Sequence, residues 1–408
     1  MRLRIKDFTT KVGSGVTPRG GAETYLEQGI PLFRSQNVYD NGFLMDDIAY
    51  ISEEVDESMS STRVKPGDVL LNITGASIGR CFYTSDSFER GNVNQHVCII
   101  RPKKNITSPS FLHYCIISNE GQEQINLSQT GANREGLSVE DIKGFSFDIP
   151  TLSVQQKIVD YLDEKTSAID AQVELLEKKK DAYTRLKKAT INRAVTRGLD
   201  EHVTLKDSGV EWIGMIPEHW EMKRFKEFAK TIKGKQCDYF DEKEKNMEVV
   251  LTVETLRQDT PTFFNYGIAE DKTQLCDEND VVVIWDGAGV GEFLKAKKGI
   301  LSSTIAIIDV DEKKVFKPYL WQWRYQIEYR LKSVPTGMGI PHLNPTLLNN
   351  YAIPVPPLFE QQIIATCLDE KSAKIDAAIA NMDKQTDALK RLKRSLINEV
   401  ISGKRMIE

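Results

Sequence analysis

The sequence IPTLSVQQKIVDYLDEKTSAID occupies residues 149–170, and VPPLFEQQIIATCLDEKSAKID occupies residues 355–376. The two stretches align without a gap at an offset of 206 residues. Both contain a Gln-Gln pair followed by a Leu-Asp-Glu-Lys tract. A match of this length indicates an internal duplication, and a repeat dominates the architecture of any chain that contains one.

Each copy predicts a long helix, because its apolar residues recur at spacings of three and four. In the two copies these residues are Ile158, Leu162, Ile169, Leu176, Tyr183 and Leu186, and Ile364, Leu368, Ile375, Met382, Leu389, Leu392 and Leu396. Such a seam with charged flanks is typical of a coiled coil. Roughly forty residues at a rise of 1.5 Å make a rod of about 60 Å. We therefore expect helices over residues 151–200 and 357–408 that pair as an antiparallel coiled coil. The alternative is an amphipathic helix on a domain surface.

The segments that precede the two helices are related as well, although more faintly. KPGDVLLNITGASIGR (65–80) resembles DENDVVVIWDGAGVGE (277–292), and GNVNQHVCII (91–100) resembles GILSSTIAII (299–308). β-Branched runs interrupted by glycine predict strands joined by turns. We expect an α+β fold with two duplicated, mainly β domains, over residues 1–150 and 201–356, each followed by one helix.

Composition and charge bound the class of protein. The chain has 408 residues, which suggests two or three domains. Its 40% hydrophobic and 28% charged residues are typical of a soluble globular protein. The net charge is −5, and each expected β domain has four more acidic than basic residues. A nucleic-acid surface must therefore be a local patch.

The cysteine pattern and the first residues of the sequence indicate the cellular compartment in which the protein is expected. The six cysteines form no C-x-x-C pair, and the five histidines do not flank them at metal-ligand spacing. This pattern predicts neither a metal site nor a disulfide scaffold, and favours a reducing compartment. The start MRLRIKDFTTK lacks an apolar signal segment, and no apolar run is long enough to cross a membrane. The expected location is cytoplasmic.

One segment imitates a cofactor-binding turn. VVVIWDGAGVG (281–291) resembles the nucleotide-binding turn of a methyltransferase or Rossmann domain. Only seven residues separate it from the next expected strand, too few for a crossover helix. The glycines are better explained by a tight turn or bulge. The sequence also lacks an N-P-P-Y segment and a G-x-x-x-x-G-K-[ST] phosphate loop. We expect a non-catalytic chain with no cofactor or metal of its own.

These features together resemble the specificity (S) subunit of a type I restriction–modification system. The resemblance rests on the helix openings IPTLSVQQKIV and VPPLFEQQIIA, the two Leu-Asp-Glu-Lys tracts and SGVEWIGMIPEHWE (208–221). It covers essentially the whole chain, although the first domain lacks its own W-I-G-x-I-P-x-x-W segment.

The resemblance implies a division of labour. Each β domain would be a target-recognition domain that reads one half of a split site on double-stranded DNA, and the paired helices would set the half-site separation. Two modification subunits would methylate adenine with S-adenosylmethionine, and two restriction subunits, which are helicase-nucleases using ATP and Mg²⁺, would complete the complex. The S subunit itself would do no chemistry.

Candidate base-reading residues are chosen by the requirement for polar side chains that can reach the edges of bases. In the first domain they are Arg34, Gln36, Asn37, Thr74, Ser77, Arg80, Asn94, Gln95, His96, Asn133 and Arg134. In the second they are Ser302, Ser303, Thr304, His342 and Asn344, with Lys233 and Lys235 as phosphate contacts. The alternative for each is a structural role; Asn94 and Gln95, for example, could close a strand by hydrogen bonds to the backbone.

Two other functions stay open from the sequence. One is a stand-alone DNA methyltransferase that uses the Asp286 turn, which S-adenosylmethionine binding by the isolated chain would support. The other is a coiled-coil scaffold that never touches DNA. Neighbouring genes for a methylase and a helicase-nuclease would argue against the scaffold.

Overall fold

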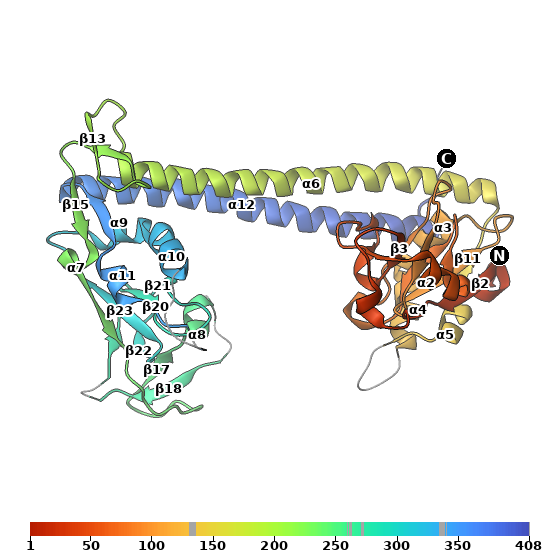
Figure 1. Cartoon of the computed structure of the whole chain (residues 1–408), viewed down its shortest axis with the longest axis horizontal. Coiled ribbons are helices and arrows are strands. Elements are labelled where there is room, and N and C mark those ends of the chain that lie inside the picture. The colour runs from red at the N-terminus through yellow and green to blue at the C-terminus, as the bar shows by residue number, and fades with distance from the viewer. Residues whose placement is uncertain are drawn as a thin grey trace. The chain divides into compact units, whose positions relative to one another are not determined.

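A computed structural model describes residues 1–129, 136–258, 260, 263–270, 273–333, 339 and 341–407. The chain divides into two compact units (Figure 1). Unit 1 comprises residues 1–177 and 382–408, and unit 2 comprises residues 178–381. Each unit therefore contains one β-rich body and part of two long helices, α6 (Leu152–Arg197) and α12 (Leu358–Ile401). Within the described residues, no helix is both long and apolar enough to cross a membrane.

The described residues of unit 1 form two four-stranded sheets and two short strand pairs. One sheet has the order β6 (Ala49–Ile51), β3 (Ile30–Phe33), β10 (Gly91–Val93), β7 (Arg63–Val64). The other has the order β2 (Thr9–Ser14), β11 (Val97–Pro102), β8 (Val69–Asn72), β9 (Cys81–Tyr83). The strand pairs are β1 (Arg2–Arg4) with β12 (Ser146–Asp148), and β4 (Val38–Tyr39) with β5 (Gly42–Phe43). The short helices are α1 (Ile5–Phe8), α2 (Glu53–Ser58), α3 (Pro109–Ile117), α4 (Asn119–Ser128) and α5 (Val139–Gly144).

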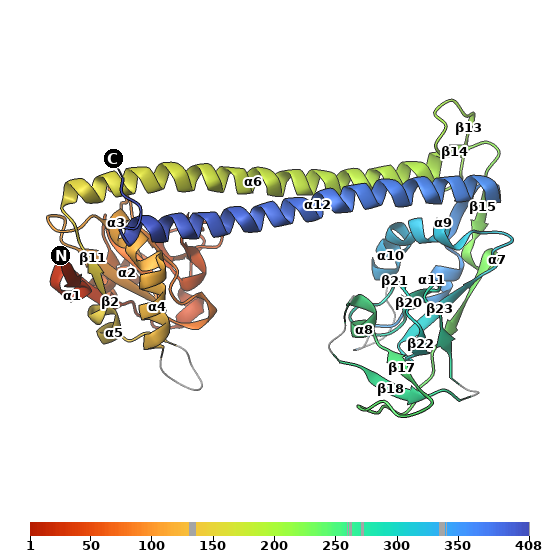
Figure 2. The ribbon, with the colours of Figure 1, turned by 180° about the vertical axis from the view of Figure 1, so that it is seen from behind.

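Unit 2, whose elements are labelled in Figure 2, also contains two four-stranded sheets. One sheet has the order β18 (Asn265–Ile268), β17 (Met247–Leu251), β22 (Gly299–Leu301), β19 (Leu275–Cys276). The other has the order β16 (Ala229–Lys233), β23 (Ile305–Val310), β20 (Val281–Ile284), β21 (Phe293–Lys295). The strand pairs are β15 (Glu221–Arg224) with β24 (Ala352–Val355), and β13 (Leu205–Asp207) with β14 (Met215–Pro217). The short helices are α7 (Phe225–Phe228), α8 (Val253–Arg257), α9 (Lys317–Gln322), α10 (Arg324–Ser333) and α11 (Pro345–Asn349).

The duplication extends from the helices to the sheets. The order β2–β11–β8–β9 in unit 1 recurs as β16–β23–β20–β21 in unit 2. In each unit, the central pair of the other sheet is parallel, β3 with β10 and β17 with β22. The predicted α+β fold with duplicated, mainly β bodies and two long helices is confirmed. The division of the chain at residues 150, 200 and 356 stays a prediction.

The repeated Gln-Gln motif joins each β body to its helix. Gln155 is fully buried; its amide donates to Ile106 O (2.8 Å) and accepts from Ser108 N (2.9 Å). Gln361 is also fully buried, and its amide donates to Lys314 O (3.1 Å) and accepts from Phe316 N (2.8 Å). A buried amide must be paired in this way, because an unmade bond would cost about 1–3 kcal/mol.

The Asp of each Leu-Asp-Glu-Lys tract makes a second junction of the same kind. Asp163 accepts a hydrogen bond from Tyr114 OH (2.6 Å), and Asp369 accepts one from Gln322 Nε2 (2.7 Å). Tyr114 and Gln322 lie 208 residues apart on α3 and α9, which are repeat-equivalent helices. The motifs that reveal the duplication therefore have a structural role.

The long helices pair antiparallel within each unit. In unit 1, Lys393 Nζ lies 2.6 Å from Asp170 Oδ2, and in unit 2, Lys187 Nζ lies 2.7 Å from Asp376 Oδ2. The two lysines are 206 residues apart, and so are the two aspartates. One ion pair therefore occurs twice, and the helices keep the same register in both units.

The apolar seam is partly different from the one that the spacing predicts. Leu162 and Leu368 are buried in the cores of unit 1 and unit 2. Leu186 and Leu392, which are repeat-equivalent, are 54% and 55% exposed. Their inclusion in the seam was wrong, because two paired helices bury only one stripe of each helix.

A close backbone approach gives a test of the fold of unit 1. A Cβ atom on Gly15 would lie 2.1 Å from Val93 O, whereas a Cβ on Gly13 would have nothing within 4 Å. We expect Gly15→Ala to lower the free energy of unfolding by about 1–3 kcal/mol, the usual cost of overpacking. Gly13→Ala, two residues away, should be neutral or slightly stabilising. Denaturant titration of both variants checks this; equal stabilities would contradict it.

Candidate nucleic-acid interface

Three turns of unit 1 meet around one surface hollow. The backbone carbonyl of Asn72, at the end of β8, accepts a hydrogen bond from Gly79 N (3.0 Å). This bond closes the turn between β8 and β9. The Asn72 side-chain amide donates to Ser35 O (2.7 Å) and so fixes a second turn. Ile73 N donates to His96 O (3.0 Å), which fixes the turn between β10 and β11. Turns from three distant parts of the sequence are thereby held together.

The hollow has a volume of about 400 Å³, and most of its lining residues have polar side chains. Its lining includes Ser35, Gln36, Tyr39, Thr74, Ser77, Arg80 and His96. Thr74 Oγ1 and His96 Nδ1 lie 2.6 Å apart, and the Arg80 guanidinium stands 5.0 Å from the centre of the Tyr39 ring. We call this the unit 1 polar hollow. It brings together five of the predicted residues, namely Gln36, Thr74, Ser77, Arg80 and His96.

Other predicted residues of unit 1 hold the turns in shape. Asn37 is fully buried and donates to Leu44 O (3.0 Å). Asn94 is 7% exposed, and its side chain accepts from His96 N (3.1 Å). Arg34 donates to Asp47 O (2.6 Å). The exposed Gln95 donates to His96 Nε2 (3.0 Å) at the edge of the hollow. Asn133 and Arg134 lie outside the described residues.

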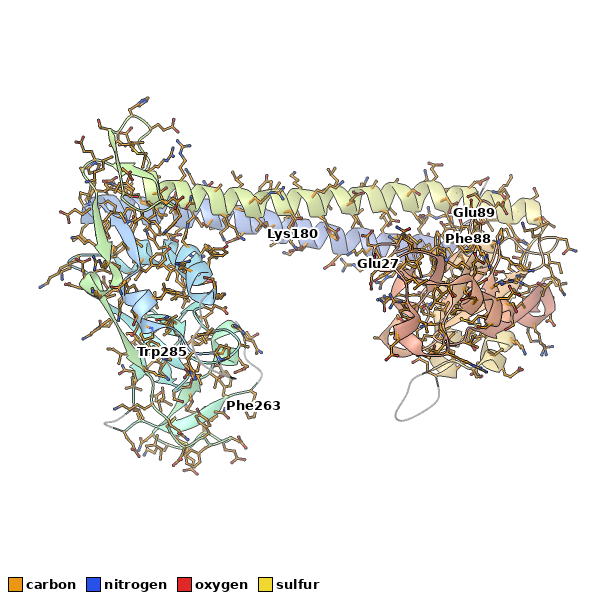
Figure 3. The ribbon with its side chains drawn as sticks, in the orientation of Figure 1. Glu27, Phe88, Glu89, Lys180, Phe263 and Trp285 are labelled. Atoms are coloured by element: carbon orange, nitrogen blue, oxygen red, sulfur yellow. The ribbon has the colours of Figure 1, made fainter. Side chains whose placement is uncertain are left out.

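Unit 2 builds a corresponding cluster from equivalent turns. Trp285 N donates to Thr304 O (2.8 Å), as Ile73 N does to His96 O in unit 1. Leu343 N donates to Trp285 O (2.8 Å), as Leu137 N does to Ile73 O (2.9 Å). Trp285 directly follows β20 (Figure 3). The backbone frame of the unit 1 polar hollow therefore recurs.

Charged side chains occupy this frame in unit 2. The Asp286 carboxylate accepts from Lys233 Nζ (2.7 Å) and lies 2.6 Å from His342 Nδ1. Burial opposes ionisation of Asp286, but the hydrogen bonds from Lys233 and His342 outweigh it and lower its pKa. Lys233 also stands 5.8 Å from the centre of the Trp285 ring. We call Lys233, Trp285, Asp286, Thr304 and His342 the unit 2 polar cluster.

The cofactor-like segment 281–291 forms a hairpin. Ile284 N donates to Glu292 O (2.9 Å), and Gly291 N donates to Ile284 O (2.8 Å). The next element is β21, which pairs antiparallel with β20. A turn that cradles a dinucleotide phosphate leads instead into a helix. The structure agrees with the expectation of a tight turn.

The remaining predicted residues of unit 2 differ in how exposed they are and in what they contact. Ser302 is 4% exposed and its hydroxyl lies 3.0 Å from Thr304 Oγ1. Asn344 caps α11 by accepting from Leu347 N (3.0 Å). Ser303 is half-buried, in the same turn. Lys235 is exposed at a separate hollow of about 430 Å³ that also involves Phe240 and Glu270. Whether any of these residues contacts DNA stays a prediction.

Sequence reasoning missed three side chains of these surfaces as candidates. Tyr39 ends the short strand β4, two residues after the buried Asn37, and nothing in the sequence marks it. Trp285 and Asp286 were attributed to a cofactor-like turn. Comparing the repeats position by position would have found them, because Trp285-Asp286 stands where Ile73-Thr74 stands in the first copy.

A metal centre would need a cluster of ligating side chains. Over the residues that the structure describes, no group of three or more His, Cys, Asp or Glu side chains could hold a metal ion.

Comparison with known proteins gives consistent relatives. The family described as type I restriction modification DNA specificity domain matches residues 2–182 and 217–389. The MjaVIII type I restriction enzyme specificity subunit of Methanocaldococcus jannaschii is 34% identical over 46% of this chain and 43% of its own length. The putative MjaX specificity subunit of the same organism is 23% identical over 98% of this chain and 92% of its own length. The chain thus spans less than half of the first relative and most of the second.

Solved structures show the same fold. A chain from a type I R-M system, in a structure concerned with complex assembly and conformational transition, has a TM-score of 0.75 at 16% identity. The match covers 98% of this chain and 97% of that one. The HsdS subunit of Thermoanaerobacter tengcongensis has a TM-score of 0.53 at 17% identity, and the match covers 99% of this chain and 96% of that one. With two matched segments that together cover most of the sequence, the chain belongs to the type I restriction–modification specificity subunit family.

Proposed function

We propose that this chain reads a bipartite site on double-stranded DNA, with the unit 1 polar hollow on one half-site and the unit 2 polar cluster on the other. The observation that carries the proposal is one backbone frame, built twice, with different side chains on it. Thr74 and His96 in unit 1 correspond to Asp286 and Thr304 in unit 2. Equivalent frames suit the same groove of a duplex, and different donors and acceptors suit different bases.

The electrostatics support local contacts rather than a general attraction to DNA. The chain is acidic overall, so few phosphates can be neutralised by it alone. Arg80 places one cation at the surface of unit 1, and in unit 2 Lys233 is paired with Asp286. The rest of the phosphate contacts would come from partner subunits.

The partners and their chemistry are part of the proposal. Two modification subunits would bring S-adenosylmethionine and methylate adenine, and two restriction subunits would bring ATP and Mg²⁺. This chain would supply specificity alone. Isolated, it should show no methyl transfer, and methyl transfer by the purified chain would favour the stand-alone methyltransferase instead.

Mapping of methyladenine across the genome, with and without this gene, tests the proposal most directly. We expect one bipartite motif to lose its methylation when the gene is deleted. The motif should return when the gene is supplied again. A methylome that does not respond to the deletion would contradict the DNA-reading function and favour a scaffold.

Arg80 gives a sharper test of the unit 1 polar hollow. Arg80→Ala removes a cation that stacks on Tyr39, and we expect DNA affinity of the assembled complex to fall by about 1–3 kcal/mol. Arg2→Ala is the matched control, because Arg2 is 52% exposed on β1 and pairs with Glu120 (2.7 Å). Fluorescence anisotropy at one fixed salt concentration compares them. Equal effects of the two substitutions would count against the hollow as a DNA contact.

A further inference from the structure

A second hollow in unit 2 has aromatic walls and lies away from the polar cluster. It has a volume of about 540 Å³ and is bounded by α6, α10 and the turn that holds Trp212. Trp212, Tyr325 and Tyr329 form its apolar walls. Its described lining residues are all different from those of the unit 2 polar cluster. We call it the aromatic hollow.

The walls of the aromatic hollow are unusually open to water. Trp212 is 52% exposed and Tyr329 is 80% exposed. Large aromatic side chains dominate the energetics of interfaces when they become buried, and clustered exposure of this kind marks an interaction site. A small molecule inside the hollow would leave the outer faces of both rings wet. A polypeptide laid across the hollow would cover them.

The charge of the hollow selects its partner. Its described lining includes two charged residues, Lys188 and Arg330, which are both cations and both exposed. Among the described residues, neither makes an ion pair. Two unpaired cations beside apolar walls are complementary to carboxylates that flank an apolar side chain.

One unpaired acceptor in the hollow distinguishes a peptide from other anions. Gln326 Oε1 is buried without a hydrogen-bond partner among the described residues, while its Nε2 donates to Asn192 Oδ1 (3.2 Å). A buried acceptor left unpaired costs free energy until a donor reaches it. The backbone N–H of a peptide is such a donor, whereas an ionised phosphate or carboxylate has none to give.

We propose that the aromatic hollow binds an acidic segment of a partner protein that assembles with this chain. One apolar side chain of the segment sits among Trp212, Tyr325 and Tyr329, its carboxylates pair with Lys188 and Arg330, and a backbone N–H satisfies Gln326. The segment binds once per chain, because the residue of unit 1 that corresponds to Tyr325 is Ile117. This role is separate from the reading of DNA.

Site-specific photocrosslinking in the assembled complex tests the proposal. The full chain carries benzoylphenylalanine in place of Tyr329 and is co-purified with its partner subunits before irradiation. We expect one protein adduct, which mass spectrometry maps to a segment where carboxylates flank an apolar residue. The matched control carries the same probe in place of Leu127 on α4, which is 79% exposed, and should not label that segment.

Charge reversal then tests the chemistry of the contact. Arg330→Glu, in the chain that carries the probe, should lower the adduct yield about tenfold, as reversal of a charge pair at an interface does. Lysine in place of the one acidic residue that faces position 330 should restore the yield, because it reforms an ion pair with the new glutamate and leaves the contact at Lys188 unchanged. An adduct on DNA, on a second copy of this chain or on a segment without carboxylates would overturn the proposal, and so would no adduct. Because labelling needs no DNA, its outcome is independent of the proposed DNA-reading function.

Discussion

Replacement of residues 1–150 by the first domain of another family member should abolish methylation at every native site and create a new motif. The new motif should differ in one half only. All three turns of the unit 1 polar hollow lie within the replaced segment, and the unit 2 polar cluster lies outside it. Each mismatched base pair costs about 1–3 kcal/mol of binding free energy. A native site that differs at several positions of one half-site should therefore no longer be bound or methylated.

The junction of such a hybrid must preserve the contacts that join domain to helix. Gln155 bonds the backbone at Ile106 and Ser108, and any domain with the same loop path supplies those groups. Asp163 needs a side-chain donor, which is Tyr114 in unit 1 and Gln322 in unit 2. A donor domain should therefore carry Tyr or Gln at the position of Tyr114.

The reciprocal hybrid is the control for the domain replacement. Exchange of residues 201–356 should change the other half-site and leave the first unchanged. Methylome sequencing reads both results as motifs. If either exchange altered both half-sites while the complex stayed active, the assignment of one reader to each unit would be contradicted.

The duplication and the helices could be predicted from the sequence because they depend on residues that make the same contacts in both copies of the repeat. Gln155 and Gln361 are buried with the same set of bonds, and the Asp170–Lys393 and Asp376–Lys187 pairs have identical partners. The two buried glutamines cannot change without loss of stability, because buried backbone groups would be left unpaired. They therefore stay visible at a constant offset.

The surface of each candidate site was harder to predict, because orientation depends on turn geometry. Asn37 and Gln36 are neighbours in the chain, yet the first is fully buried and the second lines the unit 1 polar hollow. From residue type alone, Asn37 and Gln36 are equally good candidates for a base contact, since either side-chain amide can hydrogen-bond to a base or to a backbone group. Only the path of the turn decides, and that path is set by distant bonds such as Asn72 to Ser35.

The register of the paired helices allows a test of the expectation, implied by the family resemblance, that they set the spacing of the half-sites. The Asp170–Lys393 pair lies in unit 1 and the Lys187–Asp376 pair lies in unit 2. Both helices pass from one unit to the other, α6 after Glu177 and α12 after Asn381. Four residues inserted at both points leave every pairing within each unit unchanged. Four residues inserted in α6 alone would shift α6 against α12 in one of the units and break the helix pairing there.

Equal four-residue insertions after Glu177 and Asn381 should lengthen the non-specific spacer by about one or two base pairs and leave both half-sites unchanged. The insertion adds about 6 Å to each helix, close to two base-pair steps of about 3.4 Å. Four residues also exceed one helical turn only slightly, so the apolar stripe stays nearly in phase. Methylome sequencing of the insertion strain measures the spacer directly.

Two controls separate a longer ruler from a damaged one. Four residues in α6 alone should lower the thermal stability and the methylation activity, because the helices then differ in length. Equal insertions of two residues turn each helix by a little over half a turn, which moves the buried stripe to the opposite face and should abolish activity. If the four-residue double insertion gives an active complex whose motif keeps the native spacer, the paired helices are not the ruler. The separation of the half-sites would then have to be set by something other than the paired helices.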